Sequence, residues 1–176
     1  WIASGDDIGL TQTDDGSGII AAFTGVNGTL APLVATITVT PTFENGGASN
    51  TGTPITFTIT VNPVPQINNV IETICNAGTF STVSPLDGVD GNFVPTGTTY
   101  TWEAPVSNPE NIVTGGSAGT DESVILGQTL SNLTSSPATL TYTVTPTSAE
   151  DCPGTPFTLT ITVNPTAQVV EVEDIV

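Results

Sequence analysis

The residues of this chain best equipped for chemistry are carboxylates and their amide neighbours. The densest group runs from Asp87 to Asn92, Asp-Gly-Val-Asp-Gly-Asn, and places oxygen donors between glycines. Calcium takes several oxygen ligands in a tight loop, so Asp87, Asp90 and Asn92 are the candidate calcium ligands. The spacing and terminal Glu of an EF-hand are absent. Because Asp and Gly are also the usual residues of a hydrated turn, a plain turn is the competing interpretation.

The other acidic residues are typical of solvated loop charge. The first group flanks a loop in the first module and contains Asp6, Asp7, Asp14 and Asp15. The second group follows the junction at residues 163–165 and contains Glu171, Glu173 and Asp174. An ion held by the second group would stiffen a hinge, which we retain as a hypothesis. Glu103 and Glu110 supply the two carboxylates that a glycosidase needs, but they are separated by two prolines and nothing in the sequence places them in one cleft.

The remaining composition excludes most enzyme classes. The chain has 17 Asp and Glu and no Lys, Arg or His, for a formal charge of -17. Without His or Lys there is no Ser-His-Asp or Cys-His arrangement and no Schiff-base amine, so we predict no catalysis and no cofactor other than calcium. Nucleic acid and anionic membranes are excluded as electrostatic partners, because both are bound through Lys or Arg. No direct membrane insertion is expected, since Thr interrupts every apolar run.

The hydrophobic pattern predicts an all-β fold. Apolar residues alternate with Thr in runs such as residues 55–61, which is the period of a strand with one buried face. We expect strands near residues 67–74, 79–83, 97–104, 122–129, 139–146 and 156–164, with one or two further short strands. Strands at this density favour a two-sheet sandwich.

The sequence repeats itself, and the repeat defines modules of about 100 residues. Residues 140–147 resemble residues 35–42 at an offset of 105, and residues 155–165 resemble residues 53–63 at an offset of 102. We therefore predict the C-terminal part of one module at 1–65, a complete module at 66–167 and the start of a third at 168–176. Such an arrangement is typical of a segment taken from a longer protein that is built of tandem modules.

Both cysteines lie in the complete module. Cys75 ends its first predicted strand, and Cys152 lies in the loop before its last. We predict a disulfide between them in preference to two free thiols. Closing that loop would contribute roughly 4 kcal/mol in the chain-entropy model.

Two further motifs each have a structural interpretation beside a functional one. Tyr100 and Trp102 alternate with Thr and are expected in the core, with a sugar-stacking platform as the alternative. Asn27-Gly28-Thr29 and Asn132-Leu133-Thr134 fit a glycosylation sequon at equivalent repeat positions, which a turn shared by both modules explains more simply.

Several of these motifs together resemble the PKD-like, immunoglobulin-like repeats of Bacteroidota surface proteins. The resemblance rests on residues 99–102, 115–116, 129–132, 142–146, 152–154 and 162–165 together with Cys75. The Trp-Asp-Phe-Gly-Asp-Gly signature of typical PKD domains is replaced by Trp102-Glu103-Ala104-Pro105. The resemblance implies tandem β-sandwich modules, display at the extracellular cell surface and secretion through the type IX pathway, as in gliding-motility adhesins.

Two functional classes follow. The first is a structural stalk or filament of a large secreted adhesin, in which Pro-containing connectors act as short semi-rigid spacers. Its expected partners are neighbouring repeats, further copies joined through unprotected strand edges, other cell-surface proteins or surface polysaccharide. The alternative is an accessory, carbohydrate-binding module of a secreted multidomain enzyme.

Overall fold

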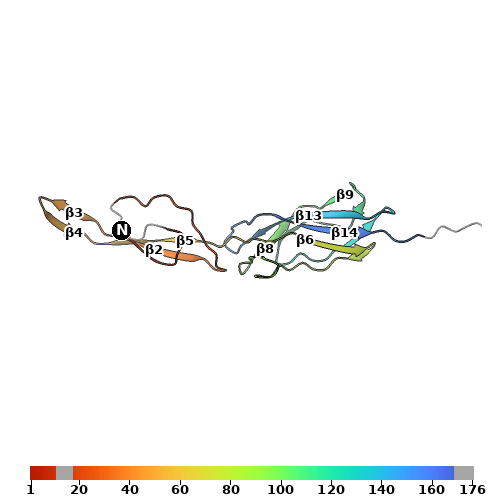
Figure 1. The fold of residues 1–176 in the computed structure, drawn as a ribbon, viewed down its shortest axis with the longest axis horizontal. Coiled ribbons are helices and arrows are strands. Elements are labelled where there is room, and N and C mark those ends of the chain that lie inside the picture. The colour runs from red at the N-terminus through yellow and green to blue at the C-terminus, as the bar shows by residue number, and fades with distance from the viewer. Residues whose placement is uncertain (11–17, 169–176) are drawn as a thin grey trace, which may run out of the picture. The chain divides into compact units, whose positions relative to one another are not determined.

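The computed structural model describes residues 1–10 and 18–168, which form two compact units. Unit 1 comprises Trp1–Val64, and unit 2 comprises Pro65–Val176. All regular elements of the described residues are β-strands (Figure 1). No helix in that part of the chain is long and apolar enough to cross a membrane.

Unit 2 is built on one large sheet. Its strands, in spatial order, are β11 (Gly119–Glu122), β8 (Thr99–Trp102), β13 (Ala138–Thr147), β14 (Phe157–Asn164) and β6 (Val70–Cys75). A further short strand, β9 (Val106–Asn108), pairs with the first half of β13. Along β13 and β14 every second residue is buried, and the residues between them are mostly Thr. The alternation predicted from the sequence is therefore the alternation between core and solvent.

A smaller sheet closes the other side of the unit 2 core. It contains β10 (Val113–Thr114), β12 (Thr129–Asn132) and β7 (Gly78–Thr79). The core between the sheets includes Phe80, Ile125 and Leu130 on this side, packed with Tyr142 and Leu159 of the large sheet. The predicted two-sheet sandwich is thus confirmed.

The first and last strands of unit 2 are parallel neighbours. β6 pairs with β14 from Val70 opposite Leu159 to Cys75 opposite Asn164, and the two strands run side by side in Figure 1. The chain consequently enters the unit at one end of this pair and leaves it at the other.

Unit 1 contains a smaller set of elements. Its sheet has the order β1 (Ile2–Gly5), β2 (Leu33–Val39), β5 (Ile55–Val61), and a separate hairpin joins β3 (Thr42–Asn45) to β4 (Ala48–Thr51). Ala35 and Ile37 of β2 are buried, together with Ile8 of the loop after β1. The side chains of β5 are far less covered than those of β14.

The predicted strands are accurate for the long hairpin and wrong around residues 122–129. That segment contains the end of β11, an isolated bridge between Ile125 and Val83, and the start of β12. β11 contains a register shift between Gly119 and Glu122, where Asp121 has a left-handed backbone (φ 53°), and the strand ends at Glu122. The short β9 and β10 correspond to the further strands that were expected but not placed.

The predicted disulfide between Cys75 and Cys152 is wrong. Both thiols are free. Cys75 lies opposite Asn164, at the end of β14, whereas Cys152 precedes Pro153 in the loop before Phe157, at the start of β14. Eight residues of strand separate the two ends, about 23 Å at roughly 3.3 Å per residue. A disulfide requires Cα atoms within about 7 Å.

Candidate functional site

The candidate calcium loop is a hydrogen-bonded turn. Asp87 Oδ1 accepts the Val94 amide at 3.0 Å, and Asn92 Oδ1 accepts the Asn68 amide at 2.9 Å. Asp90 adopts a positive φ of 53°, and its carbonyl accepts the Asn68 side-chain amide. Two of the three proposed ligands therefore already use a side-chain oxygen to close the turn, which favours the turn interpretation. The calcium site at Asp87, Asp90 and Asn92 stays a prediction.

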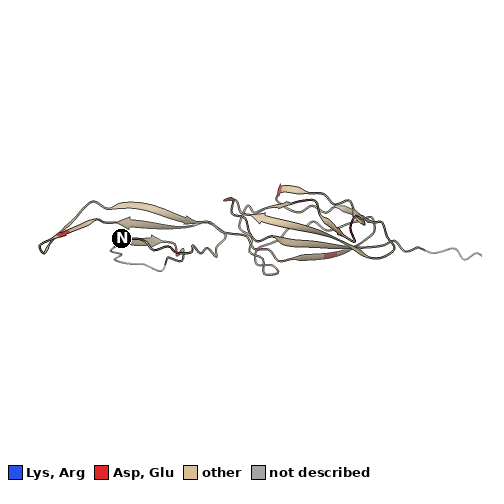
Figure 2. Ribbon diagram, turned by 90° about the horizontal axis from the view of Figure 1, so that it is seen from above, with Lys and Arg blue, Asp and Glu red and all other residues tan. Residues whose placement is uncertain are grey.

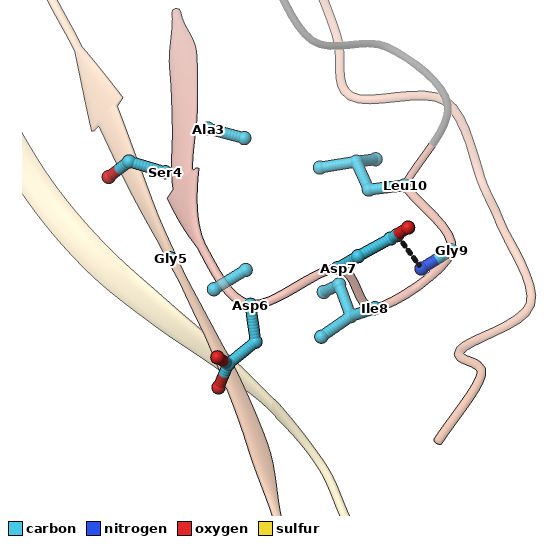
Figure 3. A pocket seen from close by; sticks show the side chains of 9 residues that line it. Ala3, Ser4, Gly5, Asp6, Asp7, Ile8, Gly9 and Leu10 are labelled. Carbon is cyan, nitrogen blue, oxygen red and sulfur yellow. Dashed lines mark hydrogen bonds between the residues drawn. The ribbon is translucent and has the colours of Figure 1, made fainter. Parts of the chain in front are cut away.

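The carboxylates of Asp6 and Asp7 in unit 1 also accept hydrogen bonds from backbone amides. Asp6 Oδ2 accepts the Val34 amide at 2.7 Å, and Asp7 Oδ1 accepts the Gly9 amide at 3.0 Å. Figure 3 shows the two carboxylates pointing away from one another at a pocket of about 440 Å³ that is bordered by Leu10. They do not converge on a common ligand position.

The described residues contain no group of three or more His, Cys, Asp or Glu side chains arranged to hold a metal. Figure 2 shows acidic positions at separate points, mostly in loops. The candidates Asp14 and Asp15, and the C-terminal group Glu171, Glu173 and Asp174, lie outside the described residues. The proposed hinge ion therefore stays a hypothesis.

Glu103 and Glu110 are not brought together as a catalytic pair. Glu103 follows β8, whose Trp102 lies opposite Val144, and Glu110 follows β9, whose Asn108 lies opposite Thr139. Val144 and Thr139, the residues of β13 that mark the two positions, are about 17 Å apart along the strand at roughly 3.3 Å per residue. The carboxyl groups of glycosidases are about 5–9.5 Å apart. Both glutamates are also exposed, so the geometry gives no support for this chemistry.

Most aromatic residues of unit 2 lie in the core, and for Tyr100 and Trp102 this is what the alternation predicts. Trp102 and Tyr100 are 5% and 2% exposed. The Trp102 indole N–H donates to the Ser117 carbonyl at 2.9 Å, and the Tyr142 hydroxyl contacts Gln128 Oε1 at 2.9 Å. Burial raises the pKa of the Tyr142 hydroxyl well above its ordinary value. None of these rings is available as a surface on which a sugar could stack.

The Asn-x-Thr motifs are structural in both units. Asn132 Nδ2 donates to the Val163 and Ser136 carbonyls, and its Oδ1 accepts the amide and hydroxyl of Thr134. Asn27 makes the same four bonds in unit 1, to the carbonyls of Val61 and Ala31 and to Thr29. The motif therefore ties a turn to the last strand of each sheet, which accounts for its repetition.

The outer face of the large sheet is covered by threonine. Thr141 lies opposite Thr160, Thr143 opposite Thr158, and Thr145 opposite Thr101. Cross-strand Thr pairs stabilise a solvated sheet face without any charge. The face presents neither an aromatic platform nor a cluster of titratable groups.

A comparison with family models decides the classification of the chain. The model of the PKD-like domain matches residues 72–167, more than half of the sequence. The chain belongs to the PKD-like domain family. The match runs from the middle of β6 past the end of β14, so the PKD-like domain corresponds to the sandwich of unit 2. Searches of curated proteins and of solved structures found no significant match.

PKD-like domains are generally non-catalytic modules of a structural or adhesive type. In this PKD-like domain Asp87, Asn92 and Asn132 accept hydrogen bonds that close turns, and Tyr100, Trp102 and Tyr142 lie in the core. The sequence analysis did not predict that the first and last strands of this domain, β6 and β14, pair in parallel. The signal available was weak, because alternation marks a strand but not its direction.

Proposed function

We propose that this chain is part of the force-bearing stalk of a large secreted bacterial cell-surface adhesin. The observation that carries the proposal is the parallel pairing of β6 with β14. Tension enters unit 2 at the start of β6 and leaves it at the end of β14. It therefore pulls the two strands past one another along their length. All six registered pairs resist together, whereas strands peeled from one end yield one pair at a time.

The chemistry of the surface supports the same role. A chain with 17 acidic residues and no basic ones keeps neighbouring stalks apart by repulsion. The connector Val163-Asn164-Pro165 contains a proline that restricts the backbone directly after β14. The internal repeat makes unit 1 the C-terminal part of a further module, so that tension would pass from module to module.

The resemblance of the motifs to repeats of Bacteroidota surface proteins supports a more specific assignment. We infer an extracellular location, secretion through the type IX pathway and a role in surface adhesion during gliding. No observation favours the accessory carbohydrate-binding role, since the aromatic rings of unit 2 are buried or half-buried.

Labelling of intact cells tests this assignment. An antibody raised against residues 65–168 should bind unpermeabilised cells that produce the protein. Gold particles should then lie at several positions along filaments that project from the surface. An antibody against a cytoplasmic protein is the control for cell integrity. Labelling that requires permeabilisation, or that coincides with a secreted enzyme activity free of filaments, would contradict the proposal.

A further inference from the structure

The chain contains two Asn-Gly dipeptides, and the structure holds them very differently. Asn27-Gly28 lies in the loop before β2, and Asn45-Gly46 lies at the turn between β3 and β4. In such a dipeptide the backbone nitrogen of the glycine can attack the carboxamide carbon of the asparagine, because glycine has no side chain to obstruct the approach. The attack requires that the asparagine side chain and the next peptide group are free to turn toward each other.

Asn27 is fixed by its side chain. Its Nδ2 donates to the carbonyls of Ala31 and Val61 at 2.9 and 2.7 Å, and its Oδ1 accepts the amide and the hydroxyl of Thr29 at 2.8 and 2.9 Å. Both ends of the carboxamide are therefore occupied. Turning this group toward the Gly28 nitrogen would break all four hydrogen bonds.

Asn45 has no such restraint. It is the last residue of β3 and lies opposite Ala48 of β4, so that the loop of the hairpin is Gly46-Gly47 (Figure 1). Both glycines have positive φ, 58° and 85°, as a tight type I′ turn requires. Within the described part of the chain, neither the side chain of Asn45 nor the amide of Gly46 makes a hydrogen bond.

The hairpin that carries Asn45 has little to hold it closed. It is a separate two-stranded sheet, and every residue of β3 and β4 is exposed. A two-stranded hairpin is marginally stable in water, so its tip opens locally. In the open tip the carboxamide carbon of Asn45 reaches the Gly46 nitrogen. All the atoms that react belong to the turn itself.

We propose that Asn45 is a site of spontaneous deamidation and that its fold protects Asn27 from the same reaction. The Gly46 nitrogen loses its proton to solvent base and bonds to the carboxamide carbon of Asn45, whose bond to the amide nitrogen breaks to release ammonia. The product is a five-membered succinimide ring. One water molecule then opens the ring at either carbonyl, which leaves aspartate or isoaspartate at position 45.

The modification changes both the charge and the shape of the turn. Either product adds a carboxylate next to Glu44. Isoaspartate also lengthens the main chain by one methylene group, in a turn whose length sets the pairing of Asn45 with Ala48. We expect isoaspartate to unpair the tip of β3 from β4. This chemistry is independent of the stalk function proposed above.

Peptide mapping of the 176-residue chain, incubated in mildly alkaline buffer, tests the proposal. The chain has no Lys or Arg for trypsin, but chymotrypsin cuts after Phe43 and so separates Asn27 from Asn45. Mass spectrometry measures the conversion of each peptide with time, and water enriched in heavy oxygen marks the residue whose ring was opened. Asn45 should convert at least about tenfold faster than Asn27, because one or two net hydrogen bonds are worth that factor in rate.

Urea and two variants provide the controls. In the urea-unfolded chain both asparagines should convert at similar rates, because no fold then restrains either dipeptide. Asn45→Gln should remove the fast conversion, because glutamine would have to close a less favourable six-membered ring. Asn50→Gln should leave it unchanged, because Asn50 is an equally exposed residue of β4 that precedes Thr51 instead of glycine.

Four results would each overturn the proposal. They are conversion of Asn27 at the rate of Asn45 or faster in the folded chain, fast conversion that persists in Asn45→Gln, fast conversion that disappears in Asn50→Gln, and no conversion of Asn45 in the time that the unfolded chain converts.

Discussion

The buried Asn132 turn allows a quantitative prediction. Replacing Asn132 by Ala removes four hydrogen bonds of 2.7–2.9 Å. Removing the donor to the buried Val163 carbonyl costs about 1–3 kcal/mol, and each bond nearer the surface contributes about 0.5–1.5 kcal/mol, which water partly replaces. We expect the free energy of unfolding of unit 2 to fall by about 2–4 kcal/mol.

Urea unfolding followed by tryptophan fluorescence measures this change. A Trp1→Phe background leaves Trp102 as the single indole, so the signal reports on the unit 2 core. Leu133→Ala is the control, because Leu133 occupies the same turn but is 66% exposed. Its effect should stay within about 0.5 kcal/mol. If Asn132→Ala were as stable as the Leu133→Ala control, the turn would not anchor β14 and the argument for the repeated motif would fail.

Three other results are expected. Gly119→Ala places a Cβ under 3.0 Å from the Trp102 indole; the displacement should lower the free energy of unfolding by about 1–3 kcal/mol and alter the near-UV circular dichroism, and an unchanged spectrum would refute the packing. Native alkylation should label the exposed Cys75 faster than the half-buried Cys152, and mass spectrometry without reductant should find no peptide linking them. Because burial raises the pKa of Tyr142, the contribution of this hydroxyl to the free energy of unfolding should be constant below about pH 10, the pKa of an unfolded tyrosine, and decrease above it. Urea midpoints at increasing pH check this, and Tyr142→Phe should weaken the decrease.

A strand could be predicted from the sequence when its own residues show the pattern of burial, and could not when its position depends on distant partners. The β13–β14 hairpin was placed to within about a residue because its alternation of Thr with Leu140, Tyr142, Leu159 and Ile161 records burial directly. The strands from β10 to β12 were not predicted accurately, because they are two to four residues long and depend on distant partners such as Gly78.

The disulfide prediction failed for a similar reason. Alternation identifies β6 and β14 as strands but does not state whether they run parallel. Had they been antiparallel, the end of β6 at Cys75 would have lain beside the start of β14, near Cys152. Their parallel register instead sends the two cysteines to opposite ends. The acidic candidates show the same limit, because only the fold reveals that Asp87 and Asn92 are occupied by backbone amides.

The most direct test of the force-bearing role compares two directions of pulling on unit 2. Handles at Gln66→Cys and Thr166→Cys, with both native cysteines replaced by Ser, load β6 against β14 along their length. Handles at Gln66→Cys and the native Cys152, with Cys75→Ser, hold the module at one end and peel the strands apart. Because forced unfolding is governed by the unfolding rate in the loaded direction, the first geometry should require a clearly higher force at the same loading rate. Equal forces in the two geometries would contradict the role assigned to the parallel terminal strands.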